Sequence, residues 1–264
     1  MDNMEHKKYL RKLRINKFLI HLVQLLIIVI FLLLWEYLSR NNIINSFIYS
    51  SPSRAIKTIY VLYKESNLFN HIWVTVYETF ISFSLATILG TVIAIILWYS
   101  QFLFRVFDPY LTVINSLPKV ALGPIIIIIF GANIKSIIIM ALLISLIVTI
   151  SNVYNGFVNT DKNKIKLLKS FKATKWQILR YLVIPSIYSV IINSLKINVS
   201  MSLIGVIMGE FLVSKQGIGY LINYGSQVFN LNLVFGGIII LLIVSYLMYV
   251  MVVYIEKLLI KNNQ

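Results

Sequence analysis

Long runs of apolar residues dominate this chain and decide what it can fold into. Six runs of about 20 apolar residues could each cross the roughly 30 Å hydrocarbon core of a bilayer as a helix. They cover residues 18–38, 79–98, 110–130, 136–153, 187–213 and 233–255. Only 12% of the residues are charged, about half the share of a typical soluble domain, so a soluble fold would lack a polar surface. The sequence therefore predicts an all-α integral membrane protein with about six transmembrane helices.

The distribution of lysine and arginine predicts which side of the membrane each loop faces, because cytoplasmic loops are enriched in these residues. Sixteen of them lie on one side of a six-span chain: in a basic tail of residues 1–17, after the second and sixth spans, and in a loop of residues 154–184. Six lie on the other side, and Lys119 and Lys196 fall within spans. We therefore expect one transmembrane domain over residues 1–264, multi-pass in the cell membrane, with both termini cytoplasmic.

Several kinds of site are excluded by composition. The chain has no cysteine, which rules out disulfides and thiolate metal sites. Its three histidines are scattered without metal-ligand spacing. A net charge of +15 could indicate nucleic-acid binding, but the basic residues alternate with apolar spans, which favours a membrane surface.

The segment of residues 39–78 is predicted to lie outside the membrane on the external side. It contains an apolar-periodic stretch after Ser51-Pro52-Ser53, with Ser53 as the expected helix cap. An amphipathic helix lying on the outer face fits this pattern.

The cytoplasmic loop carries more apolar residues than a solvated loop requires. Between Lys162 and Trp176, three lysines lie on one face of a predicted helix, and Ile165, Leu168 and Phe171 lie on another. Two interpretations stay open at this point. One is a solvated loop whose lysines only mark topology, and the other is a docking element for a cytoplasmic partner.

The residues from Ala173 to Arg180, Ala-Thr-Lys-Trp-Gln-Ile-Leu-Arg, followed by Pro185, resemble the cytoplasmic loop of permease subunits of bacterial binding-protein-dependent ABC importers. The likeness is to the nitrate, sulfonate and taurine group, which also includes permeases for thiamine precursors and other vitamins. It extends over most of the chain through Trp35-Glu36, Pro52-Ser53, Asp108-Pro109, Pro118, Pro124, Phe130-Gly131, Gly209-Glu210-Phe211 and Gly217–Ile222.

The resemblance implies a type I ABC importer permease fold, with two copies of the chain around one path. A coupling helix in the cytoplasmic loop would insert into a separate ATPase, and an extracytoplasmic binding protein would deliver the substrate. ATP and Mg would bind to the ATPase partner, and this chain contains no Gly-x-x-x-x-Gly-Lys-Ser/Thr phosphate loop. The residues implied in ATPase coupling are Lys162, Ile165, Lys166, Leu167, Leu168, Phe171, Lys172, Ala173 and Trp176.

This loop departs from the family's pattern at two positions. In the family it carries Glu-Ala-Ala, three residues and then Gly, and it ends about thirteen residues later in Leu-Pro. Lys166-Leu167-Leu168, Lys172 and Ile184-Pro185 stand at the matching positions, so the spacing to the proline is kept. If the family glycine has a positive φ, lysine there would cost on the order of 1 kcal/mol.

Polar residues within the spans are candidate functional residues, because a charge at mid-bilayer costs roughly 2.5–3.5 kcal/mol. Those assigned to the translocation path are Asn115, Lys119, Asn193, Lys196, Ser200 and Glu210. A snorkelling Lys196 and an interfacial Glu210 are the structural alternative. These two residues lie about 21 Å apart along a helix and cannot pair. Gly205 and Gly209 are predicted to let another helix approach closely.

Two other functions are consistent with a multi-span chain. A secondary transporter driven by an ion gradient would favour an inverted repeat, and no repeat is visible. An intramembrane enzyme needs a base with a nucleophile or metal ligands, and His21, the only histidine in a span, has no evident partner. We therefore expect a transport subunit without catalytic activity. Its substrate would be a small anion, a sulfonate, or a vitamin or vitamin precursor.

Overall fold

The computed structural model describes residues 2–65 and 67–261. Side chains are described for residues 13, 15–65 and 67–258. The basic residues of the tail that lie outside the described side chains are Lys7, Lys8, Arg11, Lys12 and Arg14.

Helices make up the whole architecture of the described residues, and no strand occurs among them. Five helices are long and apolar enough to span a membrane. They are α1 (Asp2–Arg40), α4 (Leu68–Tyr99), α7 (Ile134–Val158), α11 (Tyr188–Val213) and α13 (Leu231–Lys261). A bent pair of shorter helices provides a sixth. The predicted all-α membrane fold with about six apolar helices is confirmed.

The sixth apolar segment is sharply broken. Helix α5 (Gln101–Ser116) leads through a short 3₁₀ turn (Lys119–Leu122) into α6 (Gly123–Phe130), and the two parts are bent by 92°. Leu117 is extended because the ring of Pro118 disfavours a helical residue before it. Pro124 lies in the first turn of α6, where its missing N–H leaves no gap in the helix.

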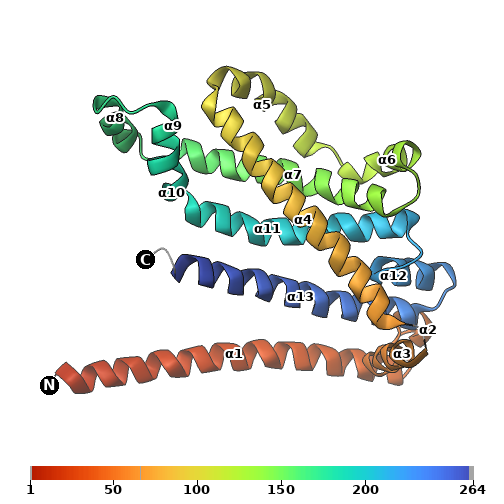
Figure 1. The fold of residues 1–264 in the computed structure, drawn as a ribbon. Helices are drawn as coiled ribbons and strands as arrows, with labels where there is room; N and C mark the ends of the chain where they lie inside the picture. Colours follow the sequence, from red (N-terminus) through yellow and green to blue (C-terminus); the bar gives the residue numbers. More distant parts are fainter. Residues whose placement is uncertain (1, 66, 262–264) are drawn as a thin grey trace.

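Helices α4, α7 and α11 form the centre of the bundle, as Figure 1 shows. Small residues bring α11 close to α7: Gly205 lies against the backbone of Ala141, and Gly209 lies against Ile137. A Cβ added at Gly209 would be 2.9 Å from Ile137 Cγ2, so no larger residue fits without movement. The two glycines therefore pack α11 against α7 of the same chain.

A buried polar contact ties the three central helices together. Thr149 Oγ1 on α7 donates to Asn198 Oδ1 on α11 at 2.7 Å, and Asn198 Nδ2 donates to Thr87 Oγ1 on α4 at 3.1 Å. Such bonds satisfy polar groups that lipid could not satisfy. They fix the relative register of the helices at this level.

A second layer covers one end and one side of this centre. Helix α12 (Ile218–Gln227) lies across the end of α11, and α13 packs on α12 and α3 (Pro52–Glu65). Buried Leu203, Ile218, Leu233 and Val244 belong to one apolar cluster between these helices. Helix α4 begins at Leu68, so residues 68–78, which the sequence placed in the external segment, belong to a long helix.

Helix α1 runs along the edge of the bundle and joins it near α3. Most of its apolar span is exposed, and Glu36 accepts hydrogen bonds from the N–H and hydroxyl of Ser53 at 3.1 and 2.8 Å. Helix α3 begins at Pro52, and the hydroxyl of Ser51 accepts from Arg54 N–H at 3.3 Å. The cap is therefore Ser51 rather than Ser53, because Pro52 occupies the first helical position.

Four short elements follow α7 at the far end of the bundle from α12. They are α8 (Lys162–Ser170), α9 (Lys175–Ile178), a π-helical turn (Leu179–Val183) and α10 (Ile184–Ser186). The beginning of α1 and the end of α13 lie at this same end (Figure 1). We name it the basic end of the bundle.

Candidate functional site

Residues 161–178, which we name the basic segment, form a compact turn-rich unit on the basic end. Asp161 caps α8 by accepting from Asn163 N–H at 2.8 Å. Thr174 and Gln177 form a capping box around α9: Gln177 N–H donates to the threonine hydroxyl at 3.3 Å, and Thr174 N–H donates to the glutamine carbonyl at 2.7 Å. Both helix starts are thus specified by local sequence.

The end of α8 is a Schellman motif with lysine where glycine is favoured. Ala173 N–H donates to Leu168 O at 3.0 Å, and Lys172 N–H donates to Lys169 O at 2.9 Å. Lys172 has a φ of +58°. A lysine in this left-handed conformation costs on the order of 1 kcal/mol relative to glycine. The turn keeps the shape that glycine would give it, at the expense of stability.

One face of the basic segment holds it to the bundle. Ile165, Leu168 and Ala173 pack against a buried cluster that includes Phe157 of α7 and Leu179. These three coupling candidates are partly buried and anchor the segment to the bundle.

The opposite face projects away from the bundle. Phe171 is 74% exposed, and Leu167 and Trp176 are also exposed. Lys162, Lys166 and Lys172 are exposed beside them. The coupling candidates thus divide into partly buried anchors and an exposed face of apolar and basic side chains.

A direct contact joins the basic segment to a long helix. Lys175 Nζ donates to Tyr99 O at 2.9 Å and lies over the Tyr99 ring, 5.5 Å from its centroid. Tyr99 is the last residue of α4, where carbonyl groups lack helical partners and attract a cation. The segment is therefore attached to α4 as well as to α7.

The structure does not gather the polar residues proposed for the path into one site. Lys196 forms an ion pair with Glu256 of α13 at 2.6 Å. Lys119 donates to the backbone and side-chain oxygens of Asn115, each at 3.2 Å, within the broken segment. Asn193 and Ser200 are exposed on α11, seven residues apart and so on one face of the helix.

Glu210 lies in a buried hydrogen-bonded cluster at the opposite end of the bundle. It is 1% exposed, and its carboxylate accepts from Thr75 Oγ1 at 2.6 Å and from Gly219 N–H at 2.5 Å. The Thr75 hydroxyl in turn accepts from Ile218 N–H at 2.8 Å. Glu210 therefore joins α11 to α4 and to the start of α12, rather than facing an open path in this conformation.

Thr75 and His71 are neighbours of Glu210 and Gly217 that the sequence did not point to. His71 Nδ1 accepts from Gly217 N–H at 3.0 Å, and Gly217 has a φ of +106°. A Cβ at Gly217 would collide with the Glu210 carboxylate. The Gly-Ile-Gly run after Glu210 was the available signal, because two glycines beside a buried carboxylate indicate a close approach of backbone.

The comparisons with known proteins agree with this architecture. Residues 86–261 match the family model described as "Binding-protein-dependent transport system inner membrane component". The chain is 24% identical over 223 residues to a putative aliphatic sulfonates transport permease protein of Bacillus subtilis, covering 84% of this chain and 81% of the relative. It is 28% identical over 189 residues to a formylaminopyrimidine transport permease protein of Halalkalibacterium halodurans, covering 72% and 75%.

A solved structure shares the fold. It is described as an inward-facing conformation of the MetNI methionine ABC transporter, and it superposes with a TM-score of 0.64 at 18% identity. The match covers 72% of this chain and 94% of that chain. Since the family model matches about two thirds of its length, this chain belongs to the inner membrane components of binding-protein-dependent transport systems.

Proposed function

We propose that this chain is the permease subunit of an ABC importer and that the exposed face of the basic segment docks a separate ATPase. The observation that carries the proposal is the exposed cluster of Leu167, Phe171 and Trp176 among lysines, on a segment fixed at both helix starts. Exposed aromatic residues on a rigid element are the usual anchors of protein interfaces. The basic end is the cytoplasmic end in this proposal, in keeping with its lysine content.

The anchored face supports a mechanical role for the segment. A docking element can transmit movement only if it is attached firmly to the helices that must move. Ile165 and Leu168 attach it to α7, and Lys175 attaches it to α4. ATP and Mg bind to the ATPase, whose closure would move both helices through these contacts.

Two copies of the chain enclose the path, and an extracytoplasmic binding protein delivers a small solute to the end at α12. The sulfonate and formylaminopyrimidine permeases among the relatives support a small-molecule substrate. The ion-gradient alternative finds less support, because hydrogen bonds from α4 and from the start of α12 hold the Glu210 carboxylate of α11.

The docking proposal is tested by co-purification with the ATPase subunit of the same importer. Phe171→Asp should weaken association by at least about 30-fold, since truncated interface anchors cost roughly 2 kcal/mol or more. Phe229→Asp is the matched control, because Phe229 is 72% exposed but lies at the opposite end. It should co-purify normally. Unchanged ATPase binding by Phe171→Asp, in a chain that still inserts into the membrane, would refute the docking role.

A further inference from the structure

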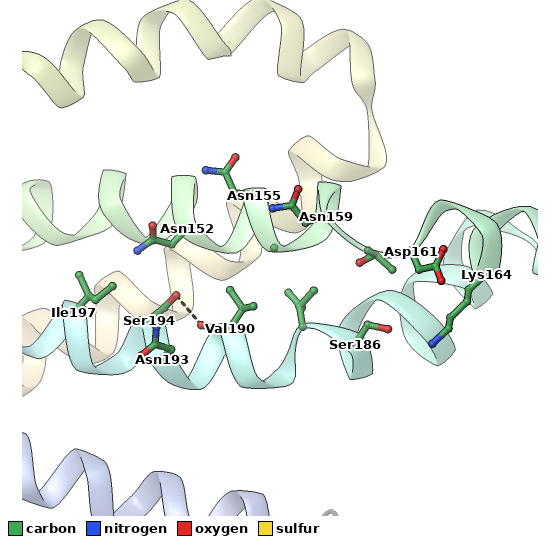
Figure 2. Close-up of a pocket in the computed structure, with 13 residues that line it drawn as sticks. Asn152, Asn155, Asn159, Asp161, Lys164, Ser186, Val190, Asn193, Ser194 and Ile197 are labelled. Carbon is green, nitrogen blue, oxygen red and sulfur yellow. Dashed lines mark hydrogen bonds between the residues drawn. The ribbon is translucent and has the colours of Figure 1, made fainter.

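A cavity of about 570 Å³ lies between α7 and α11 near the basic end, and Figure 2 shows its lining. Four asparagines are its main polar groups: Asn152 and Asn155 from α7, Asn159 at the C-cap of α7, and Asn193 from α11. The first three are three and four residues apart, so they follow one face of the helix to its end. The cavity is therefore a strip of amide groups facing a second helix.

These amides are not occupied by the protein itself. Among the thirteen residues drawn in Figure 2, the one side-chain hydrogen bond runs from Ser194 Oγ to Val190 O at 2.9 Å. Asn155, Asn159 and Asn193 are exposed. An amide facing hydrocarbon without a partner costs roughly 1–3 kcal/mol, so three exposed amides would be a heavy penalty on a lipid-facing surface. This strip therefore faces water or another polar partner rather than lipid.

The charge of the lining is balanced. Its ionisable residues are Asp161 and Lys164, one acid and one base, both at the α8 end of the cavity (Figure 2). Lys196, the nearby lysine of α11, is paired with Glu256. Asn155 also lines an adjoining cavity of about 200 Å³ between α5 and α7, where the acidic side chain is Asp108. No unpaired cation among the described side chains lies in the deeper half, so a sulfonate would lose its hydration there without a counter-charge.

Amide groups suit a different kind of solute. Each asparagine offers an N–H₂ donor and a carbonyl acceptor side by side in one plane. The same pairing recognises the adjacent amino group and ring nitrogen of adenine. An amino-substituted nitrogen heterocycle, which is uncharged at neutral pH, presents this pattern along its edge.

We propose that the amide-lined cavity binds the transported solute at the cytoplasmic end of the path, and that this solute is an uncharged, amino-substituted nitrogen heterocycle rather than a sulfonate. The inference rests on the permease function proposed above and narrows its substrate class.

Single-cysteine labelling tests the inference directly, because the chain has no cysteine of its own. Asn155→Cys and Asn193→Cys are placed in the complete transporter in inside-out vesicles and treated with a membrane-impermeant trimethylammonium thiosulfonate. Ile27→Cys on the outward-facing span of α1 is the control. Both cavity variants should react and the control should not, since only a thiol in water ionises and meets the reagent.

Protection then identifies the solute class. The aminopyrimidine 4-amino-5-hydroxymethyl-2-methylpyrimidine should slow labelling by the factor 1 + [L]/Kd, and butanesulfonate at equal concentration should not. Adding Asn152→Leu should abolish protection while labelling persists. Protection by butanesulfonate alone, protection by neither solute, or unreactive cavity cysteines would each overturn the inference. ATPase co-purification, measured on the same vesicles, separates these outcomes from a failure of the proposed function, which would appear as absence of the ATPase from the unsubstituted transporter.

Discussion

Replacing Thr75 with valine should weaken the buried hydrogen-bonded cluster around Glu210 at the α12 end. Valine has nearly the same shape, so the substitution removes hydrogen bonds and leaves packing almost unchanged. The hydroxyl donates to Glu210 at 2.6 Å and accepts from Ile218 N–H at 2.8 Å, and Thr75 is fully buried. Thr75→Val therefore leaves one buried N–H and one carboxylate oxygen without this partner. Gly219 N–H still holds the other carboxylate oxygen.

The magnitude follows from the two groups left unsatisfied. A buried donor or acceptor without a partner costs about 1–3 kcal/mol, so two of them cost about 2–6 kcal/mol. For a chain of this size that corresponds to a fall in Tm of roughly 4–24 °C. Thermal unfolding of the detergent-purified chain measures it. Trypsin cleavage after the exposed Lys215 should also accelerate, because the turn before α12 is released.

Thr79→Val is the matched control for this measurement. Thr79 is equally buried, one turn further along α4, but its hydroxyl donates only to Thr75 O, at 2.7 Å. That carbonyl already accepts a hydrogen bond within the helix, so the substitution leaves no buried polar group without a partner. If Thr75→Val unfolds at the same temperature as Thr79→Val, with equal cleavage after Lys215, the hydrogen-bonded cluster around Glu210 does not hold α12 in place.

Three further predictions test other parts of the fold. Lys172→Gly should raise stability by about 1 kcal/mol, visible as a higher Tm, because glycine relieves the positive φ, whereas Lys169→Gly in the preceding turn should lower it by about as much. Lys196→Gln and Glu256→Gln should each lower Tm by leaving a partly buried charge unpaired, and the double substitution should be less harmful than the sum of the two. Gly205→Ala should cost about 1–3 kcal/mol in the same assay, because its methyl group would meet the α7 backbone.

The membrane fold could be predicted because span length and apolar composition are written directly in the sequence. The break at Pro118 could also be predicted, since proline restricts the residue before it. The bend angle of 92° could not be predicted, because the direction of a bend depends on what the two halves pack against. The cap of α3 was misplaced by two residues, from Ser51 to Ser53, because both serines offer a capping hydroxyl and only the first helical position, Pro52, decides between them.

Long-range contacts were the part that sequence could not supply. Glu210 and Lys196 were both recognised as unusual charges within a span, but their partners lie on other helices. Thr75 is 135 residues from Glu210 along the chain, and Glu256 is on a different helix from Lys196. Helical spacing restricts pairs within one helix and says nothing about which face of another helix it meets. For this reason the candidate path residues do not form one site, and they include an ion pair, a buried hydrogen-bonded cluster and an exposed helix face.

Lys172 shows how a departure from a family pattern can preserve a shape. The sequence predicted that a lysine at a glycine position would carry a cost of about 1 kcal/mol if the turn stayed the same. The turn does stay the same, with both Schellman hydrogen bonds made. Leu168 and Ala173, on either side of it, are both packed into the buried cluster, and the capping box at Thr174 begins at once. A different turn would have to displace these anchors, and the apolar surface they bury stabilises the fold by on the order of 1–2 kcal/mol. The neighbouring contacts therefore impose the left-handed conformation on Lys172, and its side chain is directed to the exposed face beside Phe171.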